Sequence, residues 1–133
     1  DLLDRQAASI LQPALARVGG ILEGKKIAGM AEAHYAQMAP HLYTGPIEAA
    51  ANIQLATCSP NFLIQESIET FGGFYAEIIK KPIQWQDGYI IPPTDPGIGY
   101  ELDEAVADAH PFTEQKVFPP TVDKPIVLEL DGR

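Results

Sequence analysis

Short apolar runs alternate with longer segments of helical periodicity in the first half of the chain. The run SILQP, residues 9–13, ends at a proline, and apolar side chains then recur at helical intervals in ILEGKKIAGMAEAHY, residues 21–35. The run AQMAP, residues 36–40, and the segment GPIEAAANIQLATC, residues 45–58, repeat this order. Pro46 suits the first turn of the second expected helix. The pattern therefore predicts a strand followed by a helix, twice over.

A third unit follows with the same order. The run FLIQE, residues 62–66, is expected to form a strand, and SIETFGGFYAEIIKK, residues 67–81, a loop and a helix. Strands this apolar leave no face suited to water, so they are expected in a parallel sheet that helices cover on its outer side. The sequence thus predicts an α/β fold, either barrel-like or doubly wound.

The pattern changes after Pro82. Asp87-Gly88 lies between β-favouring residues and predicts a hairpin, and a crossover rich in proline and glycine comes next. A short helix within residues 101–110 and a terminal strand at residues 124–133 complete the expected elements. We therefore divide the chain into residues 1–81, which hold the strand–helix units, and residues 82–133, which hold the hairpin, crossover and tail.

Length, charge and cysteine content narrow the class of protein. A chain of 133 residues suits one domain, and a net charge of −9 disfavours nucleic acid and anionic lipid as partners. The longest uncharged stretches carry polar residues, so no membrane span is expected, and the first residues lack the features of a signal peptide. The single cysteine, Cys58, has apolar neighbours that predict a buried thiol, and it cannot form an internal disulfide. We expect a cytoplasmic protein that binds a small molecule or another protein.

Two polar side chains at the ends of expected strands form the candidate site. Ligands of parallel α/β folds bind at the carboxyl ends of the strands, where His41 follows the second strand and Glu66 ends the third. A histidine and a carboxylate there can transfer a proton and bind or polarise a substrate. The pattern alone leaves an ordinary role equally open, in which His41 caps a turn and Glu66 pairs with a lysine.

Three stretches carry a resemblance to a known family. They are residues 12–35, QPALARVGGILEGKKIAGMAEAHY, residues 39–66, APHLYTGPIEAAANIQLATCSPNFLIQE, and residues 87–104, DGYIIPPTDPGIGYELDE. In this order and spacing they resemble the C-terminal part of enolase-superfamily enzymes of the mandelate racemase and muconate lactonizing type. Within that superfamily the chain is most similar to galactonate dehydratase-like sugar-acid dehydratases, over about residues 1–112.

The resemblance implies a fold, a cofactor and two roles. It implies a modified (β/α)8 TIM barrel with a capping domain, in which this chain supplies about three C-terminal βα units and residues 82–133 return to the capping region. It implies that Mg²⁺ holds the substrate carboxylate and stabilises the enediolate formed when the α-proton is removed. His41 would act as acid or base at the α-carbon, and Glu66 would hydrogen-bond the substrate or intermediate.

Two departures from the family pattern bear on this reading. The family usually has an aspartate directly after the Gln-Pro of this strand, whereas this chain has Ala14, so His41 is expected to be less firmly held. The family's metal ligands lie on earlier barrel strands that this chain does not contain, so the ligands of Mg²⁺ are expected outside it. The remaining barrel and capping segments are then partners, either in another chain or in a further region of a longer enzyme.

The function predicted is therefore the C-terminal segment of a Mg²⁺-dependent acid-sugar dehydratase that acts on a hydroxy acid or sugar acid. A homo-oligomer is expected. A racemase or epimerase on the same scaffold is one alternative, because it shares the enediolate. A non-catalytic barrel fragment that serves assembly is another, and Ala14 is the feature that favours it.

Overall fold

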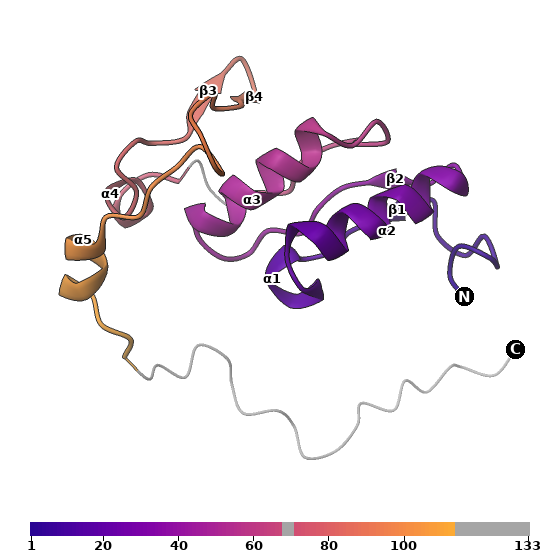
Figure 1. The fold of residues 1–133 in the computed structure, drawn as a ribbon, viewed down its shortest axis with the longest axis horizontal. Coiled ribbons are helices and arrows are strands. Elements are labelled where there is room, and N and C mark those ends of the chain that lie inside the picture. The colour runs from indigo at the N-terminus through magenta and orange to yellow at the C-terminus, as the bar shows by residue number, and fades with distance from the viewer. Residues whose placement is uncertain (68–70, 114–133) are drawn as a thin grey trace, which may run out of the picture.

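Two long helices lie side by side next to a pair of short parallel strands in the computed structural model, which describes residues 1–67 and 71–113 (Figure 1). The hairpin and the last helix lie beyond the second long helix (Figure 1). The elements in chain order are β1 (Ile10–Leu11), α1 (Leu15–Val18), α2 (Ile21–Ala33), β2 (Gln37–Met38), α3 (Pro46–Thr57), α4 (Phe74–Glu77), β3 (Gln84–Gln86), β4 (Tyr89–Ile91) and α5 (Glu104–Ala109).

The strands of the first three units are parallel neighbours, as predicted. β1 pairs with β2 in the register Ile10–Gln37 and Leu11–Met38. On the other side of β2, Met38 forms a parallel bridge with Phe62. β2 therefore lies between the first unit and the third, and the ends of all three segments point the same way.

These strands are shorter than the sequence predicted, and two prolines are the reason. One hydrogen bond continues the pairing beyond β1 and β2, because the amide of His41 donates to Pro13 O at 3.1 Å. Pro13 itself has no amide hydrogen to donate to the neighbouring strand, so regular pairing ends there. Pro40 likewise cannot donate to the segment after Phe62, so the expected strand at residues 62–66 is reduced to one bridge. The predicted strands at residues 9–13 and 36–40 shrink to two residues each.

The long helices confirm the predicted periodicity to within two residues at each end. α2 turns Gly24, Ala28 and Ala31 inward, and these small residues let it lie close to its neighbours. α3 begins at Pro46 as expected. The single turn α1 was not predicted. It ends at Gly19, whose φ of 106° suits a residue without a side chain.

Two apolar clusters form the core. The first cluster packs α2 against β2 and is built from Ala28, Ala31, Ala36 and Met38. The second cluster joins α3 to the later part of the chain and is built from Leu42, Ala49, Ile53, Phe71, Ile79 and Ile83. The two clusters therefore divide the described residues into an α2 side and an α3 side.

The later part of the chain follows the prediction in part. The hairpin forms as expected, with β3 and β4 antiparallel and positive φ angles of 51° at Asp87 and 83° at Gly88 in its turn. A loop and a helix were expected at residues 67–81, and in the described part of that segment, residues 71–81, the helix is the single turn α4 (Phe74–Glu77). The chain leaves the helix because Ile79 bridges Leu102 in antiparallel fashion instead.

An ion pair and a helix cap fix the segment that pairs with Ile79. Lys80 Nζ lies 2.7 Å from Glu101 Oε2, and this hydrogen bond holds the pKa of Glu101 below its usual range. Asp103 accepts hydrogen bonds from the amides of Ala105 and Val106 and so caps α5, the short helix predicted within residues 101–110. The strand predicted at residues 124–133 lies outside the described residues, and the division at residue 82 stays a prediction.

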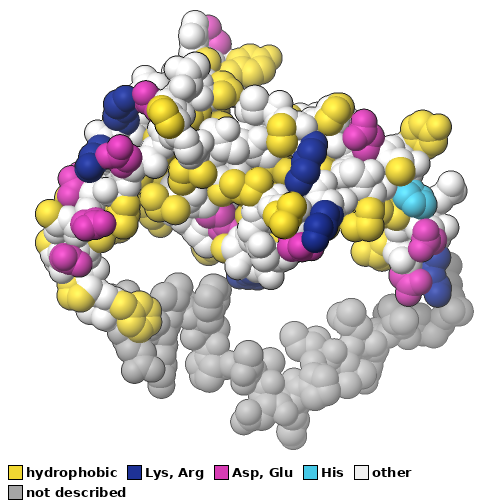
Figure 2. Space-filling view, in the orientation of Figure 1, with side chains coloured by type: hydrophobic (Ala, Val, Ile, Leu, Met, Phe, Trp, Pro, Cys, Tyr) yellow, Lys and Arg dark blue, Asp and Glu magenta, His cyan; other side chains and the backbone are white. Residues whose placement is uncertain are grey.

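Much of the surface is apolar. Figure 2 shows hydrophobic side chains spread over the face that carries α2, interrupted by a few charged groups. Leu22 is 69% exposed, and Ile10 on β1 and Ile64 after the Phe62 bridge are exposed as well. Exposure of this kind is typical of a surface that packs against further protein. None of the described helices is long and apolar enough to cross a membrane.

The prediction for Cys58 was wrong. The residue follows the last turn of α3 and is exposed, although its Sγ lies 3.4 Å from Leu55 O. Its apolar neighbours in sequence belong to the helix, and the buried face of α3 ends before this position. The apolar neighbours predicted a buried thiol because the sequence pattern does not show that Cys58 lies at the end of the helix.

The two glycines of α2, Gly24 and Gly29, provide a matched test of how closely α2 packs against α1. A Cβ at Gly24 would lie 2.4 Å from Leu15 Cδ2, whereas a Cβ at Gly29 would have no heavy atom within 4 Å. Gly29→Ala should stabilise the protein by up to about 1 kcal/mol through helix propensity. Gly24→Ala should be less stable than Gly29→Ala by about 1–3 kcal/mol because of overpacking. Urea denaturation measures both, and equal stabilities would contradict the close contact of α1 with α2.

Candidate active site

The candidate site lies where the segments after β1, β2 and Phe62 meet. His41 comes three residues after β2 and is tied to the first unit by the bond from its amide to Pro13 O. Glu66 reaches the same place from the third unit, and the amide of Leu42 donates to Glu66 Oε2 at 2.8 Å. The two residues predicted as the site therefore come together at the carboxyl ends of the parallel segments.

The side chains of His41 and Glu66 are in direct contact. His41 Nδ1 lies 2.5 Å from Glu66 Oε2, and the side chains are 34% and 37% exposed. Both groups are thus accessible to a ligand from solvent. The ordinary alternative, in which Glu66 pairs with a lysine, is not what the structure shows. An imidazole in contact with a carboxylate can accept or donate a proton at its other nitrogen.

Two amide side chains hold the backbone around His41. Asn52 Nδ2 on α3 donates to His41 O at 3.2 Å, and Gln65 Nε2 donates to Pro40 O at 3.0 Å. Asn52 is fully buried. Neither of these two roles was predicted from the sequence. The role of Asn52 could have been inferred from its position, because it is an amide side chain within the apolar face that contains Ala49 and Ile53 on α3. A buried polar side chain needs a hydrogen-bond partner.

The loop after β1 carries no carboxylate of its own at this point. Ala14 directly precedes α1 and makes no side-chain cap. The helix α1 is tied to α3, because the amide of Ala16 donates to Glu48 Oε1 at 2.8 Å. The other oxygen of Glu48, Oε2, accepts from the hydroxyl of Thr44. Glu48 therefore stabilises the approach of α1 to α3 without contacting His41.

The described residues do not fit a metal ion. Within residues 1–67 and 71–113, no group of three or more His, Cys, Asp or Glu side chains is arranged to hold one. His41 and Glu66 alone are fewer ligands than such sites use. That the ligands of Mg²⁺ lie outside this chain stays a prediction.

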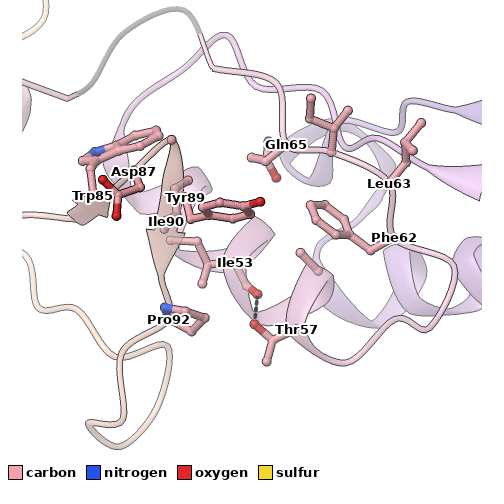
Figure 3. A pocket seen from close by; sticks show the side chains of 13 residues that line it. Ile53, Thr57, Phe62, Leu63, Gln65, Trp85, Asp87, Tyr89, Ile90 and Pro92 are labelled. Atoms are coloured by element: carbon pink, nitrogen blue, oxygen red, sulfur yellow. Dashed lines mark hydrogen bonds between the residues drawn. The ribbon is translucent and has the colours of Figure 1, made fainter.

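A hollow lies beside α3 and the hairpin. It has a volume of about 540 Å³ and is lined by α3, the segment after Phe62 and the hairpin. Figure 3 shows the ring of Tyr89 between the hairpin and the side chains of Ile53, Phe62 and Gln65. Its lining includes neither His41 nor Glu66. This hollow is therefore not lined by the candidate pair, although Gln65 lines it and also holds the backbone next to His41.

Comparison with known proteins finds a matching family and several similar proteins. Residues 1–106 match the family model described as enolase C-terminal domain-like. The chain is 34% identical to D-xylonate dehydratase of Haloferax volcanii, over 88% of this chain and 28% of that protein. It is 41% identical to D-galactonate dehydratase of Ralstonia nicotianae, over 79% of this chain and 29% of that protein. The chain thus spans less than a third of the length of these relatives.

Solved structures resemble the chain over a similar share. A protein from Labrenzia alexandrii DFL-11, described as a mandelate racemase/muconate lactonizing enzyme, is 63% identical with a TM-score of 0.82, covering 86% of this chain and 29% of that chain. A structure of an enolase from Pantoea ananatis with bound D-gluconate and Mg is 30% identical with a TM-score of 0.78, covering 84% of this chain and 27% of that chain.

The support of His41 by Asn52 can be tested against a second amide on the same helix. Asn52→Ala removes a buried donor and should destabilise the protein by about 1–3 kcal/mol in urea denaturation. Hydrogen exchange at the amides of His41 and Leu42 should also become faster. Gln54, which donates to Ile98 O at 3.2 Å, is the control. Gln54→Ala should leave exchange at these two amides unchanged, and an equal effect of both variants would contradict a specific role for Asn52.

Proposed function

The chain belongs to the enolase C-terminal domain-like family, and from this premise we propose that it is the C-terminal barrel segment of an acid-sugar dehydratase, a hydro-lyase. The support is its similarity to D-xylonate dehydratase and D-galactonate dehydratase. The observation that carries the proposal is the 2.5 Å contact of His41 Nδ1 with Glu66 Oε2 at the strand ends. It provides a proton-transfer group at the place where ligands of such folds bind.

The reaction proposed is elimination of water from a 2,3-dihydroxy acid. The hydrogen on the carbon next to the carboxylate leaves as a proton, and the hydroxyl on the following carbon accepts a proton and leaves as water. The resulting enol rearranges to a 2-keto acid. His41 would take the first proton or supply the second, and Glu66 would bind a substrate hydroxyl through Oε1, since Oε2 is already engaged.

The complete protein would contain this chain together with the polypeptide that supplies the remaining barrel strands and the capping domain, whether in the same or another chain. The short share of its relatives that this chain spans supports this view. We also propose Mg²⁺ as the cofactor, with its ligands outside this chain, on the support of the Pantoea ananatis structure with D-gluconate and Mg. A homo-oligomer stays a prediction.

Racemisation or epimerisation is the second candidate function. It is favoured by the 63% identity to a protein described as a mandelate racemase/muconate lactonizing enzyme. This reaction would share the removal of the proton next to the carboxylate but would return a proton to the opposite face, without loss of water. The product therefore separates the two candidates.

Replacement of His41 tests the proposal in the complete protein. With D-galactonate and D-xylonate as first substrates, His41→Gln should lower formation of 2-keto acid about 100-fold or more, because the amide cannot transfer a proton. His34→Gln is the control, since His34 is exposed and its ring lies 3.8 Å from Asp4. It should keep full activity.

The products formed distinguish the dehydratase from the racemase or epimerase and from the non-catalytic fragment. Solvent deuterium entering the substrate with inversion and no 2-keto acid would favour the racemase or epimerase. No turnover and no exchange with a broad panel of sugar acids would favour the non-catalytic fragment. Activity that survives His41→Gln would contradict the role of His41.

A further inference from the structure

The ring of His41 has one acidic partner within the described residues. That partner is Glu66, whose Oε2 lies 2.5 Å from Nδ1. The loop after β1 offers no alternative, because Ala14 has no polar side chain and makes no cap. Glu48 also cannot serve, since its two oxygens accept from the Ala16 amide and the Thr44 hydroxyl. Among the residues that the structure describes, a carboxylate that orients His41 must therefore be Glu66.

Glu66 Oε2 is fixed by the same backbone that carries His41. The amide of Leu42, the next residue, donates to it at 2.8 Å, and Leu42 itself is buried in the second cluster. A hydrogen bond from an amide to a carboxylate is stronger than one between neutral groups. The oxygen that faces Nδ1 is thus held in place, and rotation of the imidazole away from it would break a charge-assisted contact.

The contact determines where the ring proton lies. An ionised carboxylate only accepts hydrogen bonds, so His41 Nδ1 must be the donor. In the neutral ring Nε2 then carries no proton and is the basic atom, because the bond made by one nitrogen sets the state of the other. Nε2 has no hydrogen-bond partner among the residues that the structure describes.

We propose that Glu66 is the positioning residue of His41: its Oε2 holds the Nδ1–H tautomer and leaves Nε2 to exchange a proton with the substrate. This inference rests on the proposed function of the same site and deepens it. Glu66 then has two tasks, one for each oxygen, with Oε1 left for a substrate hydroxyl. The carboxylate that orients the histidine comes from the third unit of the chain, and none is needed at position 14.

The tautomer can be measured without any activity, by ¹⁵N NMR of the complete protein labelled at histidine and assigned with His41→Gln. At a pH where the ring is neutral, Nδ1 of His41 should give the signal of a protonated nitrogen and Nε2 that of an unprotonated one. Glu66→Met removes the acceptor and should abolish this preference. A ring protonated at Nε2 in the wild type, or an unchanged tautomer in Glu66→Met, would overturn the inference.

Two further variants separate orientation from loss of folding or of substrate binding. Glu66→Gln keeps an oxygen for the Leu42 amide, so it should fold and retain the tautomer, while kcat falls about tenfold or more because a neutral amide stabilises the imidazolium poorly. Ala14→Asp in the Glu66→Met background should raise kcat about tenfold with little change in KM. The reason is that position 14 adjoins Pro13, whose carbonyl accepts from the His41 amide at 3.1 Å.

These experiments test the positioning role of Glu66 separately from the proposed dehydratase function. Absence of rescue by Ala14→Asp would count against the positioning role. The expected tautomer together with no lyase activity would support the positioning role and count against the proposed function. Glu101→Gln is the control, because it removes a carboxylate from the exposed pair with Lys80 and should change neither tautomer nor kcat.

Discussion

The site depends on the way the backbone from Pro40 to Leu42 is held. The carbonyl of Pro40, the amide and carbonyl of His41 and the amide of Leu42 each have a hydrogen-bond partner. These partners come from the loop after β1, from α3 and from the segment that ends in Glu66. The position of the imidazole is therefore set by tertiary contacts from all three units, which is the kind of support that a reactive group needs.

The two prolines that end the strands also create this arrangement. A parallel ladder would use every carbonyl and amide in turn, but Pro13 and Pro40 have no amide hydrogen to give. The chain at these points stops pairing as a regular sheet, and the carbonyl of Pro40 becomes available to the side chain of Gln65. The prolines that interrupt the sheet therefore also leave backbone groups free to hold the site.

Local sequence patterns predicted much of the fold, and the structure places the two predicted site residues, His41 and Glu66, in contact. The family resemblance and the C-terminal barrel fold are confirmed, as are the two long helices and the hairpin at Asp87. The contribution of Asn52 could not be read in this way, because it depends on α3 lying beside the His41 segment. The early end of α4 likewise depends on a distant partner, Leu102, which local periodicity does not reveal. The chemical roles of His41 and Glu66 remain predictions.

The two apolar clusters give His41 an unusual mechanical position. Met38 is anchored in the first cluster and Leu42 in the second, and only three residues join them. A displacement of the α2 side relative to the α3 side would therefore strain the hydrogen bonds that hold residues 40–42. The orientation of the imidazole thus depends on how further protein packs against both sides of the molecule.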